Sequence, residues 1–95
     1  MTRKERVYLQ LKELCEDYSL DTINDEIVIG FSSNEIGEKL NIQRNAASEE
    51  LNKLFRENKV IKFKGKPVLF FDKRKLEKIF NIEIEYISGG IEIDN

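Results

Sequence analysis

The 95-residue chain is predicted to fold as a mainly helical α+β domain. Two capping boxes, each followed by apolar residues at helical spacing, predict helices, and an alternation of apolar residues and lysines predicts a hairpin. With 40% hydrophobic and 36% charged residues, the chain has enough apolar surface to close one small core.

The first expected element is a helix over residues 2–18. Thr2 and Glu5 have the spacing of a capping box at its start. Residues 21–25 are then predicted to turn, and residues 26–31 to form a short extended segment. The single cysteine lies on the apolar stripe of the helix and is expected to pack in the core, as free cysteines commonly do. The stripe consists of Val7, Tyr8, Leu11, Leu14, Cys15 and Tyr18.

A second helix is predicted immediately after the second capping box, which Ser32 and Glu35 form. Phe31 and Ile36 have the spacing of a hydrophobic staple across this helix start. Asn41 can end the helix, because asparagine tolerates the left-handed conformation that a helix terminus requires. The helix is therefore short and well delimited at both ends.

A third helix follows after a short turn and is predicted to run from Gln43 or Arg44 to about Asn58. Gly37 in the preceding helix costs about 1 kcal/mol relative to alanine, which indicates a close approach between helices. Two helices joined in this way, the second longer and more polar, are typical of a helix-turn-helix. The core stripe of the third helix consists of Ala47, Leu51, Leu54 and Phe55.

The lysine-rich segment KVIKFKGKPVLFFD predicts a hairpin with Gly-Lys-Pro at its tip. The alternation in its first strand places Ile61 and Phe63 on the core side. Lys62 and Lys64 are then expected to face solvent. Both faces of the return strand, residues 68–71, are apolar, which predicts that this strand is covered on both sides.

A fourth helix is predicted after Asp72, whose side chain can cap it. Its inward-facing residues are expected to be Leu76, Ile79 and Phe80. The resulting order is that of a winged helix-turn-helix, with a three-helix core, a two-stranded wing and an extra C-terminal helix. This domain is assigned to residues 1–80. Residues 81–95 are expected to form an acidic linker or tail that leads toward downstream domains.

Charge is distributed unevenly along the sequence. The net charge is −2, yet residues 44–75 contain ten basic and four acidic side chains. Residues 16–38 contain seven acidic side chains and no basic one. A local excess of positive charge in an acidic chain indicates an anionic partner for that segment.

Several classes of function are excluded or disfavoured. The chain contains no histidine, so metal sites and catalytic relays that require imidazole are ruled out. The sequence around Gly65 lacks the glycine spacing of a phosphate-binding loop. No apolar run has the length of a membrane span or a secretory segment. We therefore expect a cytoplasmic protein that is not an enzyme and needs no cofactor.

The segment from GFSSNEIGEKLNI through KVIKFKGKPVLFFDK resembles a known family. It is similar to the N-terminal winged-helix domain of bacterial sigma-54-dependent regulators of the levanase-operon type, over roughly residues 3–80. The most specific part is residues 51–54 together with the basic wing. The resemblance implies a transcriptional activator of sugar uptake or metabolism genes. It also implies a downstream ATPase and regulatory domains phosphorylated by the phosphotransferase system. Because a single module of this size presents few contacts to DNA, tight binding is expected to require homo-oligomers formed through those domains.

The expected function is sequence-specific binding of double-stranded DNA. Arginine, asparagine and glutamine can pair with base edges, and residues at the leading end of a recognition helix usually reach those edges. The candidate residues on the third helix are Gln43, Arg44, Asn45, Ser48, Glu49, Asn52 and Lys53. Those on the wing are Lys62, Lys64 and Lys66, of which the resemblance implies that Lys64 and Lys66 contact the DNA backbone.

Two alternatives remain at this point. The outer face of the third helix is also compatible with an ordinary solvated face on which Glu49 pairs with Lys53 at i,i+4. In the second alternative, the winged helix binds a protein through its apolar hairpin and its acidic N-terminal half, with no role for DNA.

Overall fold

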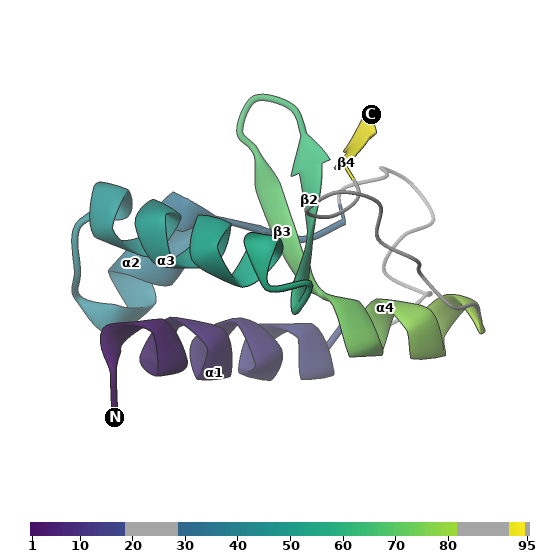
Figure 1. The fold of residues 1–95 in the computed structure, drawn as a ribbon, viewed down its shortest axis with the longest axis horizontal. Coiled ribbons are helices and arrows are strands. Elements are labelled where there is room, and N and C mark those ends of the chain that lie inside the picture. The colour runs from purple at the N-terminus through teal and green to yellow at the C-terminus, as the bar shows by residue number, and fades with distance from the viewer. Residues whose placement is uncertain (19–28, 82–91, 95) are drawn as a thin grey trace.

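The computed structural model describes residues 1–18, 29–81 and 92–94, which form a layer of helices against a small sheet (Figure 1). The elements are α1 (Arg3–Glu16), β1 (Phe31–Ser32), α2 (Ser33–Leu40), α3 (Arg44–Arg56), β2 (Val60–Lys64), β3 (Leu69–Asp72), α4 (Lys73–Phe80) and β4 (Glu92–Asp94). The order from α1 to α4 agrees with the predicted α+β arrangement and is compatible with a winged helix.

Strand β3 occupies an inner position in the sheet, whose order is β1-β3-β2-β4. It pairs antiparallel with β1 on one side and with β2 on the other. All four of its residues are buried, which confirms the prediction that the return strand is covered on both faces. Strand β4 pairs with β2 in parallel.

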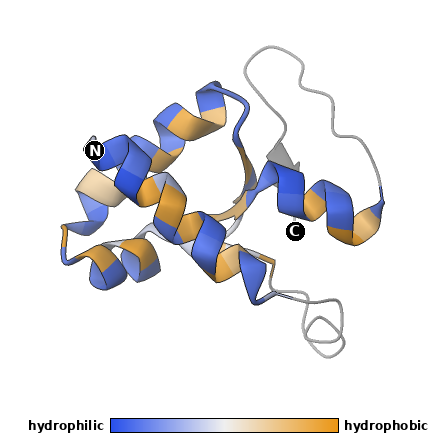
Figure 2. Cartoon of the chain, turned by 90° about the horizontal axis from the view of Figure 1, so that it is seen from below, coloured by the Kyte–Doolittle hydropathy of each residue, from blue (hydrophilic) through white to orange (hydrophobic). Residues whose placement is uncertain are grey.

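The core lies between the helices and the sheet. Helix α1 contacts α2, α3 and β3, and the helices carry hydrophobic and hydrophilic stretches in alternation (Figure 2). This alternation gives each helix an apolar side to bury. The buried hydrophobic residues are Val7, Leu11, Cys15, Ile36, Ala47, Leu51, Leu54, Val60, Ile61, Phe63, Leu69, Phe70, Phe71 and Leu76.

The helix starts follow the predicted caps. The Thr2 side chain accepts a hydrogen bond from the Glu5 backbone N–H at 3.1 Å, and the capping box is complete. Ser32 and Glu35 form the same arrangement at the start of α2. Asp72 caps α4 with its carboxylate. These interactions are local in sequence, which explains why the pattern alone located them.

The turn between α2 and α3 brings two backbone segments close together. Asn41 has a φ of 57° and ends α2 in the left-handed conformation, as predicted. The Ile42 N–H donates to the Gly37 carbonyl at 2.9 Å. A Cβ at Gly37 would lie 2.8 Å from the Ile42 carbonyl oxygen, and the first residue of α3 is the next neighbour. The segments that approach Gly37 closely, as expected, are therefore the α2–α3 turn and the first residue of α3.

One core prediction in α4 is wrong. The sequence pattern predicts that Phe80 faces inward, but this residue is 43% exposed, whereas Leu76 is buried. Helix α4 contacts β3, and its last turn projects away from the other helices (Figure 1). Phe80 belongs to that projecting turn, so the described residues offer it little to pack against.

Two sequence predictions fall on segments that the structure describes only in part. The turn predicted at residues 21–25 and most of the extended segment at residues 26–31 lie outside the described residues. Of the predicted linker at residues 81–95, only residue 81 and β4 are described, so the linker remains a prediction. Within the described ranges, every helix is too short or too polar to cross a membrane.

We predict that Gly37→Ala destabilises the fold by about 1–3 kcal/mol, because the added methyl group would press on a backbone carbonyl that cannot easily move. Alanine normally favours a helix over glycine, so the expected sign is opposite to the usual one. Urea unfolding followed by circular dichroism measures the difference.

Gly65→Ala is the matched control. A Cβ there would lie at an ordinary 3.4 Å from the Pro67 carbonyl oxygen, so the change is expected to stay within about 0.5 kcal/mol. Equal stability of the Gly37 and Gly65 variants would contradict the proposed close approach.

Candidate nucleic-acid interface

The outer face of α3 has one flank that faces the wing. On this flank, the Asn52 side-chain amide donates to the Ser48 carbonyl at 2.9 Å and accepts from Lys62 Nζ at 3.1 Å. The Lys62 ammonium also lies 5.5 Å from the centre of the Phe55 ring. Lys62 is therefore half-buried against α3, which corrects the prediction that it faces solvent on the wing. Its long side chain reaches the neighbouring helix, an interaction that strand alternation does not reveal.

The other flank of α3 faces α1 and is an ion-pair network. Arg3 Nη2 donates to Glu49 Oε2 at 3.0 Å, and Arg3 Nε donates to Glu50. Lys53 Nζ lies 3.4 Å from Glu50 Oε1. The pairing of Glu49 with Lys53 that belonged to the solvated-face alternative is not formed, because Glu49 pairs with Arg3 and Lys53 pairs with the buried Glu50.

Glu50 is a structural residue that the sequence pattern did not single out. It is only 4% exposed and lies on the side of α3 that faces α1. The hydrogen bond from Arg3 holds the pKa of this carboxyl below its usual value, against the opposing effect of burial. Glu50 lies three residues after Ala47 and four before Leu54, within the apolar stripe, and this position could have indicated that it is buried.

The leading end of α3 and the wing share one groove of about 320 Å³. Arg44, Asn45 and Ser48 contribute from α3, and the first turn of α2 contributes the opposite wall. Three predicted recognition residues are therefore brought together with the tip of the hairpin. The complete lining is Ser32, Ser33, Asn34, Arg44, Asn45, Ser48, Pro67 and Val68.

The remaining predicted residues are exposed and lie close in sequence to residues that line the groove. Gln43 is exposed and precedes α3 without capping it through its side chain. Lys64 and Lys66 are exposed on either side of the wing tip, next to the groove residue Pro67. Lys59 does not join them. It precedes β2 at the opposite end of the strand, where it lines a different hollow with α1 and α4.

The described residues offer little to reaction chemistry. Cys15 is fully buried, as predicted, and burial raises the pKa of its thiol to about 12. Such a thiol stays protonated at neutral pH and is a poor nucleophile. Within the described ranges, no group of three or more histidine, cysteine, aspartate or glutamate side chains could hold a metal ion.

Comparison with curated proteins shows that the chain is similar to transcriptional regulators. It is 41% identical over 81 residues, or 85% of the chain, to the transcriptional regulatory protein LevR of Bacillus subtilis. It is 32% identical over 85 residues, or 90% of the chain, to the transcriptional regulatory protein DagR of Salmonella typhimurium. The predicted resemblance to regulators of the levanase-operon type is thereby confirmed.

The chain spans only a small part of these relatives, 8% of LevR and 9% of DagR. No protein-family model matches the chain, and no solved structure gives a significant match. The similarity therefore supports a role in transcription regulation.

We predict that acidification weakens the packing of α1 against α3. The folded-state pKa of Glu50 lies below its unfolded value, so this carboxylate stabilises the fold at pH values above that unfolded value. The contribution is lost as the pH falls through the folded-state pKa. Urea unfolding of the wild type and of Glu50→Gln should therefore differ most near neutral pH, and the two should converge in acid. A pH-independent difference would show that the charge of Glu50 does not contribute.

Proposed function

We propose that the chain binds double-stranded DNA sequence-specifically and thereby directs a transcriptional regulator to its sites. The observation that supports this most is the shared groove, in which the leading end of α3 meets the wing tip and the first turn of α2. Helix-turn-helix proteins contact base edges with the leading end of the second helix. They fix their register on the duplex through phosphate contacts from neighbouring elements.

Each part of the site has a role in this proposal. Arg44 and Asn45 are exposed at the leading end of α3 and are proposed to read base edges in the major groove. Asn52 is held by Ser48 and Lys62, which fixes its side chain before DNA arrives. Gln43 and Ser48 extend the surface of the leading end. Lys64 and Lys66 are proposed to contact phosphates, for which a flexible point charge is well suited.

The carboxylate of Glu49 on the outer face of a recognition helix requires an explanation. Its partner is Arg3, at a distance of 3.0 Å, rather than Lys53. The guanidinium offsets the negative charge that would otherwise face the DNA backbone. We propose that Arg3 thereby allows α3 to approach the duplex on its α1 flank.

The structure disfavours the protein-binding alternative in the form that the sequence suggested. The apolar hairpin residues Ile61, Phe63 and Leu69 are buried in the core of the chain itself. The large hydrophobic side chains that remain exposed in the described residues are Met1, Leu9 and Phe80. They belong to α1 and α4 or their ends, so the hairpin offers no continuous apolar surface to a partner.

The resemblance to the levanase-operon type of regulator supports further proposals about the whole protein. We propose that this domain works in a sigma-54-dependent activator of sugar-related genes, with an ATPase and regulatory domains of the phosphotransferase system downstream. One module of this size touches DNA at few points, so tight binding is proposed to depend on oligomers formed through those domains.

We predict that replacing Lys64 and Lys66 together by alanine lowers the affinity for specific and random DNA similarly. Phosphate contacts carry no sequence information, and each one releases counterions on binding. The slope of log affinity against log salt should become shallower by about 0.9 for each phosphate that is no longer neutralised, up to roughly two units. Fluorescence anisotropy titrations at several salt concentrations measure this slope.

Asn45→Ala is the matched control for the wing variant. It should weaken binding to a selected sequence by about 1–3 kcal/mol and leave random DNA and the salt slope unchanged. If the double lysine variant folds and its slope and affinity are unaltered, the wing is not part of a DNA interface.

A further inference from the structure

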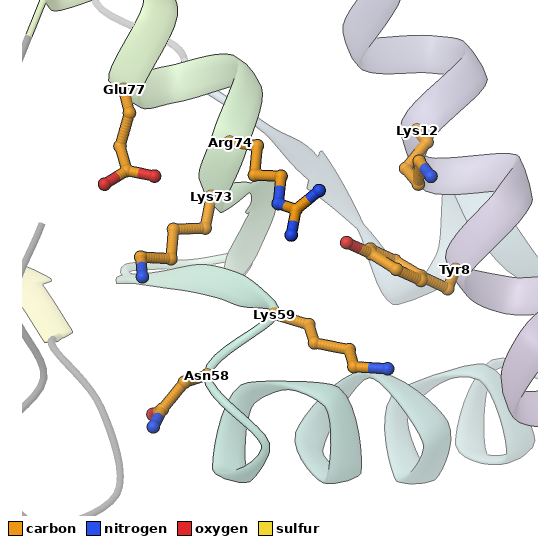
Figure 3. Close-up of a pocket in the computed structure, with 7 residues that line it drawn as sticks. All are labelled: Tyr8, Lys12, Asn58, Lys59, Lys73, Arg74 and Glu77. Carbon is orange, nitrogen blue, oxygen red and sulfur yellow. The ribbon is translucent and has the colours of Figure 1, made fainter. Parts of the chain in front are cut away.

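The described residues form a second concentration of positive charge, in a hollow at the base of the hairpin (Figure 3). Its volume is about 320 Å³, and its walls come from α1, the segment before β2, and α4. It shares no lining residue with the DNA groove. The lining residues are Tyr8, Lys12, Asn58, Lys59, Lys73, Arg74 and Glu77.

Cations dominate this lining. Four lysine or arginine side chains line the hollow, and Glu77 is the one carboxylate among the lining residues. The ammonium groups of Lys12 and Lys59 lie 5.0 and 5.7 Å from the centre of the Tyr8 ring. Across the described residues, the ion pairs of the fold do not involve Lys12, Lys59 or Arg74. The Tyr8 ring faces two of these charges, Lys12 and Lys59, and the charge of Lys59 also helps to lower the pKa of Glu57.

The hollow is held in place by hydrogen bonds between its walls. The Tyr8 hydroxyl donates to Asp72 Oδ1 at 3.0 Å, and Asp72 Oδ2 accepts from the Lys75 N–H that it caps. Burial and the neighbouring Asp72 raise the pKa of Tyr8 to about 12, so the hydroxyl keeps the proton that it donates. The Lys73 N–H donates to the Lys59 carbonyl at 3.3 Å and joins the other two walls. Both Asp72 oxygens are occupied within the fold.

This hollow lies well away from the DNA groove. Lys59 and the wing tip stand at opposite ends of β2, which spans roughly 16 Å for its length. Asn58 follows the trailing end of α3, roughly 20 Å along that helix from Arg44. In Figure 3 the side chains of Arg74 and Lys59 extend toward Tyr8, whereas that of Lys73 points away from it, so the charges of Arg74 and Lys59 converge on the part of the hollow that Tyr8 lines.

We propose that this hollow is a binding site for a small phosphorylated molecule. The Arg74 guanidinium can bind two phosphate oxygens at once, and the ammonium groups of Lys12 and Lys59 supply further charge from two other walls. The volume is at the lower end of small-molecule sites, which suits a compact ligand. Its distance from Arg44 and from the wing tip favours a free phosphate ester over the backbone of a duplex bound at the groove.

The test is an NMR titration of the 95-residue chain with inorganic phosphate and with glycerol 3-phosphate. Glycerol and sodium chloride at matched ionic strength serve as neutral and ionic controls. The proposal predicts saturable shifts at the amides of Lys59 and Arg74 with both phosphates, and none of that kind with the controls. Either Lys59→Ala or Arg74→Ala should weaken binding about tenfold, because each removes a charge-assisted hydrogen bond.

The double variant Lys64→Ala and Lys66→Ala is the matched control, because it removes two cations from the chain without touching the hollow. Its phosphate affinity should equal that of the wild type. Shifts that do not saturate, or that sodium chloride reproduces, would overturn the proposal. Phosphate binding that is unchanged in both Lys59→Ala and Arg74→Ala would also overturn it. The proposal would also be overturned if amide resonances in the hollow shifted with a DNA duplex and not with either phosphate. The hollow would then belong to the DNA interface.

Discussion

The burial of strand β3 on both faces is the constraint on which the rest of the structure depends. Phe70 and Phe71 point to opposite faces of the sheet and are both buried, so both faces of β3 must be covered. Its pairing with β2 holds the wing, and its pairing with β1 sets the entry to α2. Asp72 at its end starts α4 and anchors Tyr8 of α1. The groove and the basic hollow are both built around this strand.

Folding divides the basic segment between two places. Residues 44–75 form one continuous excess of positive charge in the sequence. In the structure, Arg44 lines the groove and Lys66 precedes its wing-tip residue Pro67, whereas Lys59 and Arg74 line the hollow at the base of the hairpin. The two carboxylates of α3, Glu49 and Glu50, are paired with Arg3 and Lys53. An acidic chain can thus present positive charge at α3, because Glu49 and Glu50 on that helix are paired within the fold.

Local features of this fold could be predicted from the sequence, and tertiary contacts could not. The capping boxes and the left-handed Asn41 depend on residues within one turn of one another, so their spacing is sufficient. The partner of Glu49 is Arg3, which is 46 residues away in the sequence, and no helical pattern indicates it. Strand alternation places Lys62 on one face with Lys64, and Lys59 lies close to them in the sequence. Only the packing of α3 and α1 beside the hairpin shows that one is held by Asn52 and the other faces Tyr8.

The central claim is that DNA lies against the leading end of α3 and the wing tip. Cys15 is buried with a thiol pKa of about 12, so a cysteine introduced at the surface can be labelled selectively. An iron chelate that cleaves DNA would be attached to Lys66→Cys at the wing tip or to Lys12→Cys in the hollow, and bound to a duplex selected from random sequences. The account predicts localised cleavage from position 66 and none above background from position 12. Equal cleavage from both positions, or cleavage from position 12 alone, would contradict it.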